Sequence, residues 1–184
     1  MGTYLVTGIV QEIAIDKRQI KYSDITVDKI TEKLKNELNL DYYDYTEDSE
    51  GHYWKINPKI LEGNLVEFLS TQFQMYQNKT NSNMEKAIHQ LGEAANGEEI
   101  IKLAESRTLI NFQLVDQLIE YIYVTRDNGF NEDIMICYNL IAYFMNGKII
   151  TEGLGNSLRY FEANIRLQRD KYPIADCVKV MITS

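Results

Sequence analysis

The longest hydrophobic segment of the chain runs from Ile134 to Met145, where Asn139 is the only residue that is neither apolar nor aromatic. A segment that is apolar on all sides belongs in the core, but it has no period that separates a helix from a strand. An Asn at position 131 suits a helix N-cap and Asn146-Gly147 suits a helix end, so we predict a buried helix over residues 131–147. The alternative is a strand, because many of these residues favour β-structure and Asn-Gly also suits a hairpin turn.

The beginning of the chain carries a strand pattern followed by a helix pattern. Residues 3–15 are rich in β-branched residues and predict a strand, with Gly8 as the place for a bend. Apolar residues then recur every four positions from Ile30 to Leu38, with charged residues between them. This spacing predicts an amphipathic helix that starts after Thr26, whose side chain suits an N-cap.

A hairpin and a second helix complete the N-terminal part. Residues 42–57 hold two aromatic runs on either side of an acidic stretch, which predicts a β-hairpin. Asn57-Pro58 then suits a helix start, and the apolar spacing predicts a helix to about residue 77. The polar segment 77–83 is the best place for a boundary, so residues 1–77 form a predicted β-α-β-β-α unit.

The rest of the chain, residues 84–184, is predicted to be mainly helical and to pack with the first unit as one compact body. Helices are expected over residues 84–95, 98–107 and 108–126, followed by an extended piece at 149–151. A further helix is expected to be capped by Asn156 or Ser157 and ended by Pro173, with Leu158, Phe161, Ile165 and Leu167 on or near its inner face. The tail at 176–182 is predicted to be either a strand or a docking helix. The predicted fold class is therefore α+β.

Composition places the chain among ordinary globular proteins. A length of 184 residues with 45% hydrophobic and 25% charged residues suits one domain with a sizeable core. The N-terminus lacks a signal-peptide pattern, and the longest apolar run is far shorter than the roughly 18 residues that a membrane helix requires. Cys137 and Cys177 both lie among apolar neighbours and are expected to be reduced core residues. We therefore expect a cytoplasmic protein.

The net charge of −8 bears on the partners that the protein can bind. All of the excess lies in residues 1–130, because residues 131–184 carry six acids and six bases. Such a surface disfavours nucleic acid, which needs clustered Lys and Arg, and it permits a basic protein partner. The alternative is that the charge serves solubility alone.

The richest cluster of polar and aromatic residues is the predicted hairpin. Carboxylates beside exposed aromatic rings bind Lys and Arg through ion pairs and cation–π contacts. The candidate binding residues are Asp44, Tyr45, Glu47, Asp48, Glu50, Tyr53 and Trp54. The alternative is a solvated turn whose aromatic side chains pack inward.

No set of residues in the sequence predicts catalysis or a bound metal. Glu85, His89 and Glu93 share one helix face, but zinc sites usually use more His or Cys, so we predict no metal, and no cofactor is expected. Arg159, Arg166 and Arg169 share one stripe with Glu162 among them, which favours ion pairs within that helix. No catalytic residue is assigned.

Charge and size together favour a non-enzymatic interaction protein that presents an acidic aromatic surface to a basic protein partner. A toxin-neutralising, immunity-type inhibitor is one class with these properties, by analogy alone. The alternatives are a small-ligand-binding protein or enzyme with a cleft between the two halves, and a structural subunit of an assembly.

Overall fold

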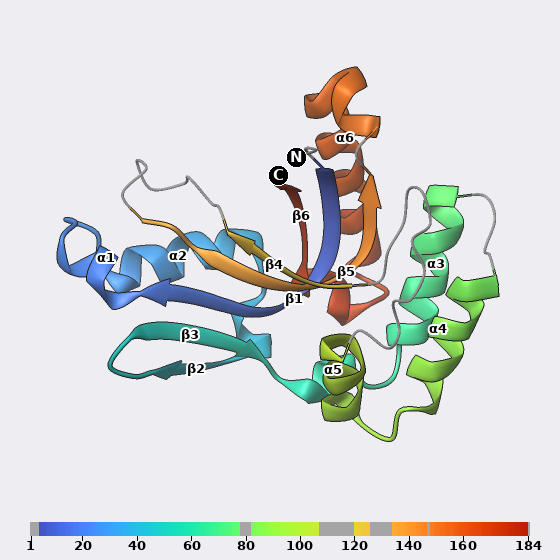
Figure 1. Cartoon of the computed structure of the whole chain (residues 1–184), viewed down its shortest axis with the longest axis horizontal. Helices are drawn as coiled ribbons and strands as arrows, with labels where there is room; N and C mark the ends of the chain where they lie inside the picture. Colours follow the sequence, from blue (N-terminus) through green and yellow to red (C-terminus); the bar gives the residue numbers. More distant parts are fainter. Residues whose placement is uncertain (1–3, 78–81, 107–119, 126–133, 147, 184) are drawn as a thin grey trace.

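A computed structural model describes residues 4–77, 82–106, 120–125, 134–146 and 148–183, and it shows an α+β fold (Figure 1). The strands are β1 (Tyr4–Asp16), β2 (Tyr43–Glu47), β3 (Gly51–Ile56), β4 (Glu120–Thr125), β5 (Cys137–Asn146) and β6 (Val178–Thr183). The α-helices are α1 (Lys17–Lys21), α2 (Val27–Glu37), α3 (Leu65–Gln77), α4 (Ser82–Glu93), α5 (Gly97–Glu105) and α6 (Lys148–Gln168). Three 3-10 helices are η1 (Leu40–Tyr42), η2 (Pro58–Leu61) and η3 (Pro173–Cys177).

Strand β1 is the centre of a six-stranded antiparallel sheet. It pairs with β5 along one edge, and on the other edge it pairs first with β6 and then with β3. The strand predicted for residues 3–15 is therefore confirmed, and its pairing with β5 shifts register at Thr7/Gly8. A Cβ on Gly8 would lie 2.9 Å from the Ile141 carbonyl oxygen, so the close approach of β5 requires glycine here.

The helix predicted over residues 131–147 is wrong, because Cys137–Asn146 form strand β5. Residues 131–133 and 147 lie outside the described part of the chain. The predicted burial is confirmed, since Tyr138 and every residue from Leu140 to Phe144 are buried. β5 lies between β1 and β4, so its backbone has strand partners on both edges.

Helices cover both faces of β5 and explain why it is apolar throughout. Successive side chains of a strand point to opposite faces. Tyr143 contacts Phe68 of α3 with ring centroids 5.9 Å apart, and Phe144 contacts Phe161 of α6 at 4.8 Å. Figure 1 shows α6 alongside β5 and β6, while α1 and α2 lie behind the other end of the sheet. The hydrophobic core is therefore built around β1 and β5.

Local signals placed the N-terminal elements correctly. Helix α2 begins after Thr26, whose side chain accepts a hydrogen bond from the backbone N–H of Lys29. The hairpin is strands β2 and β3. Asn57 caps the next segment as predicted, but the expected helix to residue 77 is split into η2 and α3 around Gly63, whose φ of 83° interrupts a helix.

In the second half, two short helices are confirmed and a third prediction is wrong. Helices α4 and α5 match the expected segments 84–95 and 98–107 within a few residues. Part of the helix predicted over 108–126 is strand β4, which pairs with β5, while residues 107–119 lie outside the described residues. The boundary expected near 77–83 stays a prediction, although strands from both sides of it pair in one sheet.

The C-terminal segment differs most from its predicted form. Residues 149–151 and the expected cap at Asn156 or Ser157 all lie within helix α6, so both predictions are wrong. Phe161 and Ile165 are buried as predicted and Leu158 is partly buried, but Leu167 is 76% exposed. The tail takes the first of its two predicted forms, strand β6.

Candidate functional site

The turn of the β2–β3 hairpin is fixed by its own backbone and by the start of α1. The Asp48 carboxylate accepts hydrogen bonds from the backbone N–H groups of Gly51 and Glu50 at 2.9 and 2.8 Å, and these bonds lower the pKa of Asp48. The backbone N–H of Lys17 donates to the Glu50 carbonyl oxygen at 2.9 Å, and Lys17 Nζ donates to the Asp48 carbonyl oxygen. The turn is therefore held against the body of the protein.

Tyr45 lies over two more deeply buried rings on one face of the hairpin. The cross-strand pairs Tyr45–Trp54 and Glu47–His52 place these side chains on the same face. The Tyr45 ring centroid lies 5.2 Å from that of Trp54 and 6.1 Å from that of His52. Tyr45 is 47% exposed, whereas Trp54 is 4% exposed. Tyr45 is therefore the aromatic surface residue, and Trp54 supports it from within.

Tyr45, His52 and Glu47 form a small polar cluster at the edge of this face. The Tyr45 hydroxyl lies 2.8 Å from His52 Nδ1, and Glu47 Oε2 lies 3.4 Å from the same nitrogen. Burial lowers the pKa of His52, with a contribution from the charge of Lys17 that outranks the opposing charge of Glu47. Burial and the neighbouring Glu47 raise the pKa of Tyr45. These directions favour a neutral histidine and a neutral tyrosine at neutral pH.

The acidic side chains of the hairpin differ in how far they are neutralised. Every residue from Asp44 to Glu50 is exposed. Glu47 has Lys17 Nζ at 3.5 Å, while the carboxylates of Asp44 and Glu50 make no ion pair within the described residues. Lys55, which pairs with Asp44 across the two strands, directs its Nζ to Glu12 at 3.2 Å. The hairpin therefore keeps a net negative surface around Tyr45.

A hollow of about 540 Å³ adjoins the hairpin turn. Its lining includes Gln19 of α1, Glu50 and Tyr53 of the hairpin, and Cys137 of β5. Tyr53 is half-buried and faces this hollow's side of the sheet, opposite to Tyr45. Arg18 at the same place is engaged by Asp16, with 2.6 Å between Nη2 and Oδ2. The hollow extends the hairpin surface toward α1.

The other residues singled out from the sequence form no site of their own. Glu85, His89 and Glu93 are exposed on α4, where His89 Nδ1 lies 3.3 Å from Glu93 Oε2. No group of three metal-binding side chains comes together among the described residues. The ion pairs predicted between Glu162 and its neighbours Arg159 and Arg166 do not form within the described residues, so that prediction is wrong. Arg169, which follows the end of α6, pairs with Asp176 at 3.0 Å from Nε to Oδ1.

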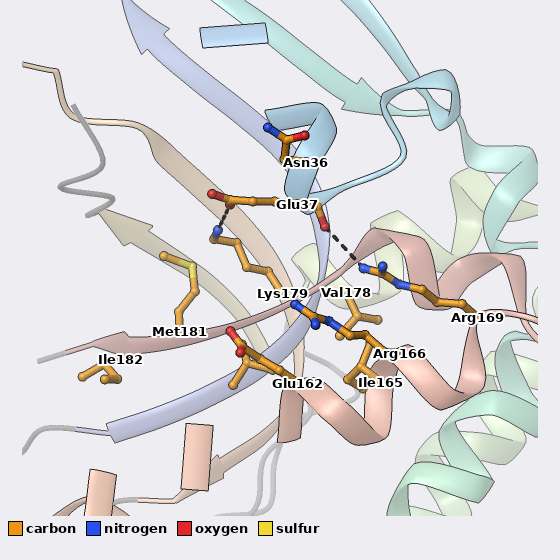
Figure 2. A pocket seen from close by; sticks show the side chains of 11 residues that line it. Asn36, Glu37, Glu162, Ile165, Arg166, Arg169, Val178, Lys179, Met181 and Ile182 are labelled. Atoms are coloured by element: carbon orange, nitrogen blue, oxygen red, sulfur yellow. Dashed lines mark hydrogen bonds and ion pairs between the residues drawn. The ribbon is translucent and has the colours of Figure 1, made fainter. Parts of the chain in front are cut away.

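A second hollow, of about 750 Å³, was not predicted from the sequence. It lies between the end of α2 (Asn36, Glu37), the C-terminal part of α6 with the residue that follows it (Glu162 to Arg169), and β6 (Val178 to Ile182), as Figure 2 shows. We call it the β6 groove. The wall from α2 is more than one hundred residues away in sequence from the other two walls, and α6 and β6 are joined through η3. No local motif therefore marks the groove.

Two further observations bear on the class of protein. None of the helices that the structure describes is long and apolar enough to cross a membrane. No protein-family model matches the chain, and comparison with curated proteins and with solved structures gives no match either.

Proposed function

We propose that the acidic hairpin, residues 43–56, docks a basic protein partner, and that the protein acts through this contact rather than by catalysis. The observation that carries the proposal is the continuous exposed segment from Asp44 to Glu50, in which two carboxylates lack an ion pair within the described residues. An exposed tyrosine ring, held in place by Trp54 and His52, stands among these carboxylates.

The chemistry of this surface matches arginine and lysine side chains. Carboxylates accept charge-assisted hydrogen bonds from a guanidinium group, and the face of a tyrosine attracts a cation by about 0.5–1 kcal/mol at an exposed site. The net charge of −8 adds long-range attraction, which acts mainly on the association rate. An inhibitor of the immunity type, which covers a basic functional surface, would use these properties.

The test compares two variants that remove the same charge from different places. The hairpin variant is Asp44→Asn with Glu47→Gln and Glu50→Gln, which leaves Asp48 to hold the turn. The control variant is Asp170→Asn with Glu93→Gln and Glu98→Gln, all at exposed positions away from the hairpin. The probe is a fluorescein-labelled peptide of four Gly-Arg repeats, and its binding is measured by polarisation at low and high salt.

The hairpin variant should bind the probe about tenfold more weakly than wild type at low salt, since three exposed charge contacts of about 0.5 kcal/mol each give about that factor. The control variant should lose much less, and the difference should vanish in about 1 M salt. Equal losses in the two variants would show that net charge alone attracts the peptide. Absence of binding to the wild-type protein would also contradict the proposal.

A further inference from the structure

The outer edge of β6 carries no strand in the described part of the chain. β6 pairs with β1 along residues 178–183, and β1 occupies one edge of it only. Five consecutive residues, Val178 to Ile182, line the β6 groove. Because successive side chains of a strand point to opposite faces, a hollow that meets all five runs along the edge of the strand. The backbone N–H and C=O groups of this edge therefore border the groove.

The lysine of β6 does not guard this edge. Exposed edge strands are usually protected by a charged side chain, most often lysine, that projects beside them. Lys179 is instead engaged by the carboxylate of Glu37 at the end of α2 (Figure 2). Its Nζ also lies 4.7 Å from the ring centroid of Tyr138. The one charged side chain of β6 is thus turned toward α2.

The walls of the groove determine what it can admit. The end of α2 stands on one side of β6 and α6 on the other (Figure 2), so the edge is recessed between two helices. A recessed edge admits a single extended segment more readily than the edge of a second copy, which carries the same flanking helices. The lining holds three bases and two acids, in contrast to the net charge of −8 of the whole chain.

Most of these charges are already engaged. Glu37 holds Lys179, and Arg169 holds Asp176 and lies with Nη2 at 3.5 Å from the Glu37 carbonyl oxygen. Arg166 and Glu162 of α6 also line the groove, and neither makes an ion pair within the described residues; Arg166 is the exposed one of the two. Its guanidinium is therefore available to a carboxylate of a bound segment.

We propose that the β6 groove binds an extended peptide segment of a partner protein, which adds a strand to β6 and places an acidic side chain against Arg166. Main-chain hydrogen bonds to the strand edge supply affinity in this mode, and the side chains of alternate residues supply specificity. The inference does not rest on the proposed function of the hairpin, which lies on another surface and favours basic side chains.

The experiment uses the full chain and a fluorescein-labelled peptide of sequence Thr-Val-Thr-Val-Glu-Val-Thr-Val. We expect saturable binding, with amide chemical-shift changes concentrated in Val178 to Ile182. Arg166→Glu should weaken binding of this peptide at least tenfold. A peptide with Lys in place of Glu should bind the Arg166→Glu protein more tightly than it binds the wild-type protein. Arg159→Glu is the control, because Arg159 is an exposed arginine of α6 that does not line the groove.

A second peptide, in which the two Val residues beside Glu are replaced by Pro, tests the strand pairing itself. Proline has no N–H to donate, so this peptide should lose binding although it keeps the carboxylate. Equal binding of the proline peptide, or equal effects of the two arginine variants, would overturn the proposal. The absence of binding at millimolar peptide would also overturn it. So would a dimer in sedimentation whose formation, without peptide, shifts the amide signals of Val178 to Ile182, because a second copy would then occupy the groove.

Discussion

Gly92 and Gly97 both lie in helices, yet the structure gives opposite expectations for their replacement by alanine. A Cβ on Gly97, at the start of α5, would lie 1.7 Å from the carbonyl oxygen of Pro58 in η2. A Cβ on Gly92 in α4 would have one neighbour within 4 Å, the Cγ2 atom of Val66 at 3.7 Å. The first position is filled by backbone and the second is open to an ordinary contact.

The magnitudes follow from helix propensity and from packing. Alanine is favoured over glycine within a helix by about 0.5–1 kcal/mol, so Gly92→Ala should raise the free energy of unfolding by about this amount. At position 97 the Pro58 oxygen must retreat by more than 1 Å, because Cβ atoms essentially never come within 3.0 Å of such an atom. Overpacking of this kind costs about 1–3 kcal/mol, which exceeds the helix gain, so Gly97→Ala should be destabilising.

The assay is urea unfolding followed by the fluorescence of Trp54, the only tryptophan of the chain and a buried one. Circular dichroism measured on the same samples should give coincident transitions if unfolding is two-state. For a chain of this size, each kcal/mol shifts the melting temperature by roughly 2–4 °C. The slope of free energy against urea should stay unchanged in both variants, since the surface exposed on unfolding is the same.

Gly92→Ala serves as the matched control, because it makes the same chemical change in a neighbouring helix. If Gly97→Ala were as stable as wild type or more stable, η2 and α5 could not approach as closely as the structure shows. A loss of stability in both variants would instead show that α4 has no room for a methyl group beside Val66, and the packing argument would fail at that position.

Two further predictions concern titratable groups. Because burial lowers the pKa of His52 below its ordinary value of 6.5, the unfolded chain takes up a proton first as the pH falls, and the free energy of unfolding should decrease between about pH 7 and pH 5. In His52→Gln the free energy of unfolding, measured with urea at both pH values, should decrease less than in wild type. An equal decrease in the two proteins would contradict this prediction. Burial raises the pKa of the Cys177 thiol to about 12, so a thiol reagent should modify the half-buried Cys137 first and Cys177 only on unfolding; rapid reaction of both thiols in native protein would contradict this.

Local sequence signals were sufficient where the deciding contacts are local. Thr26 caps α2 through Lys29, three residues away, and Asn57 caps η2 through Lys59, two residues away. The alternation of aromatic runs around a polar turn likewise marked the hairpin. Such contacts join residues close in the chain, so the residue types alone predict them.

The hairpin surface shows where this local information ends. The acidic residues and Tyr45 are exposed, as a binding surface requires, but Trp54 lies beneath Tyr45. Which ring lies outside depends on the pairing of β3 with β1, and β1 is more than thirty residues earlier in the chain. The β6 groove depends entirely on such distant contacts, so no residue spacing in the sequence indicates it.

The segment around Leu140 was predictable as core and unpredictable as strand. Its apolar residues determine that it is buried, because nothing in it suits a solvent face. Its conformation was decided by β1 and β4, which offer hydrogen-bonding partners to both edges, and by α3 and α6, which cover its faces. A sequence without a hydrophobic period fits helix and strand equally well, so only the neighbours brought by the tertiary fold made β5 a strand.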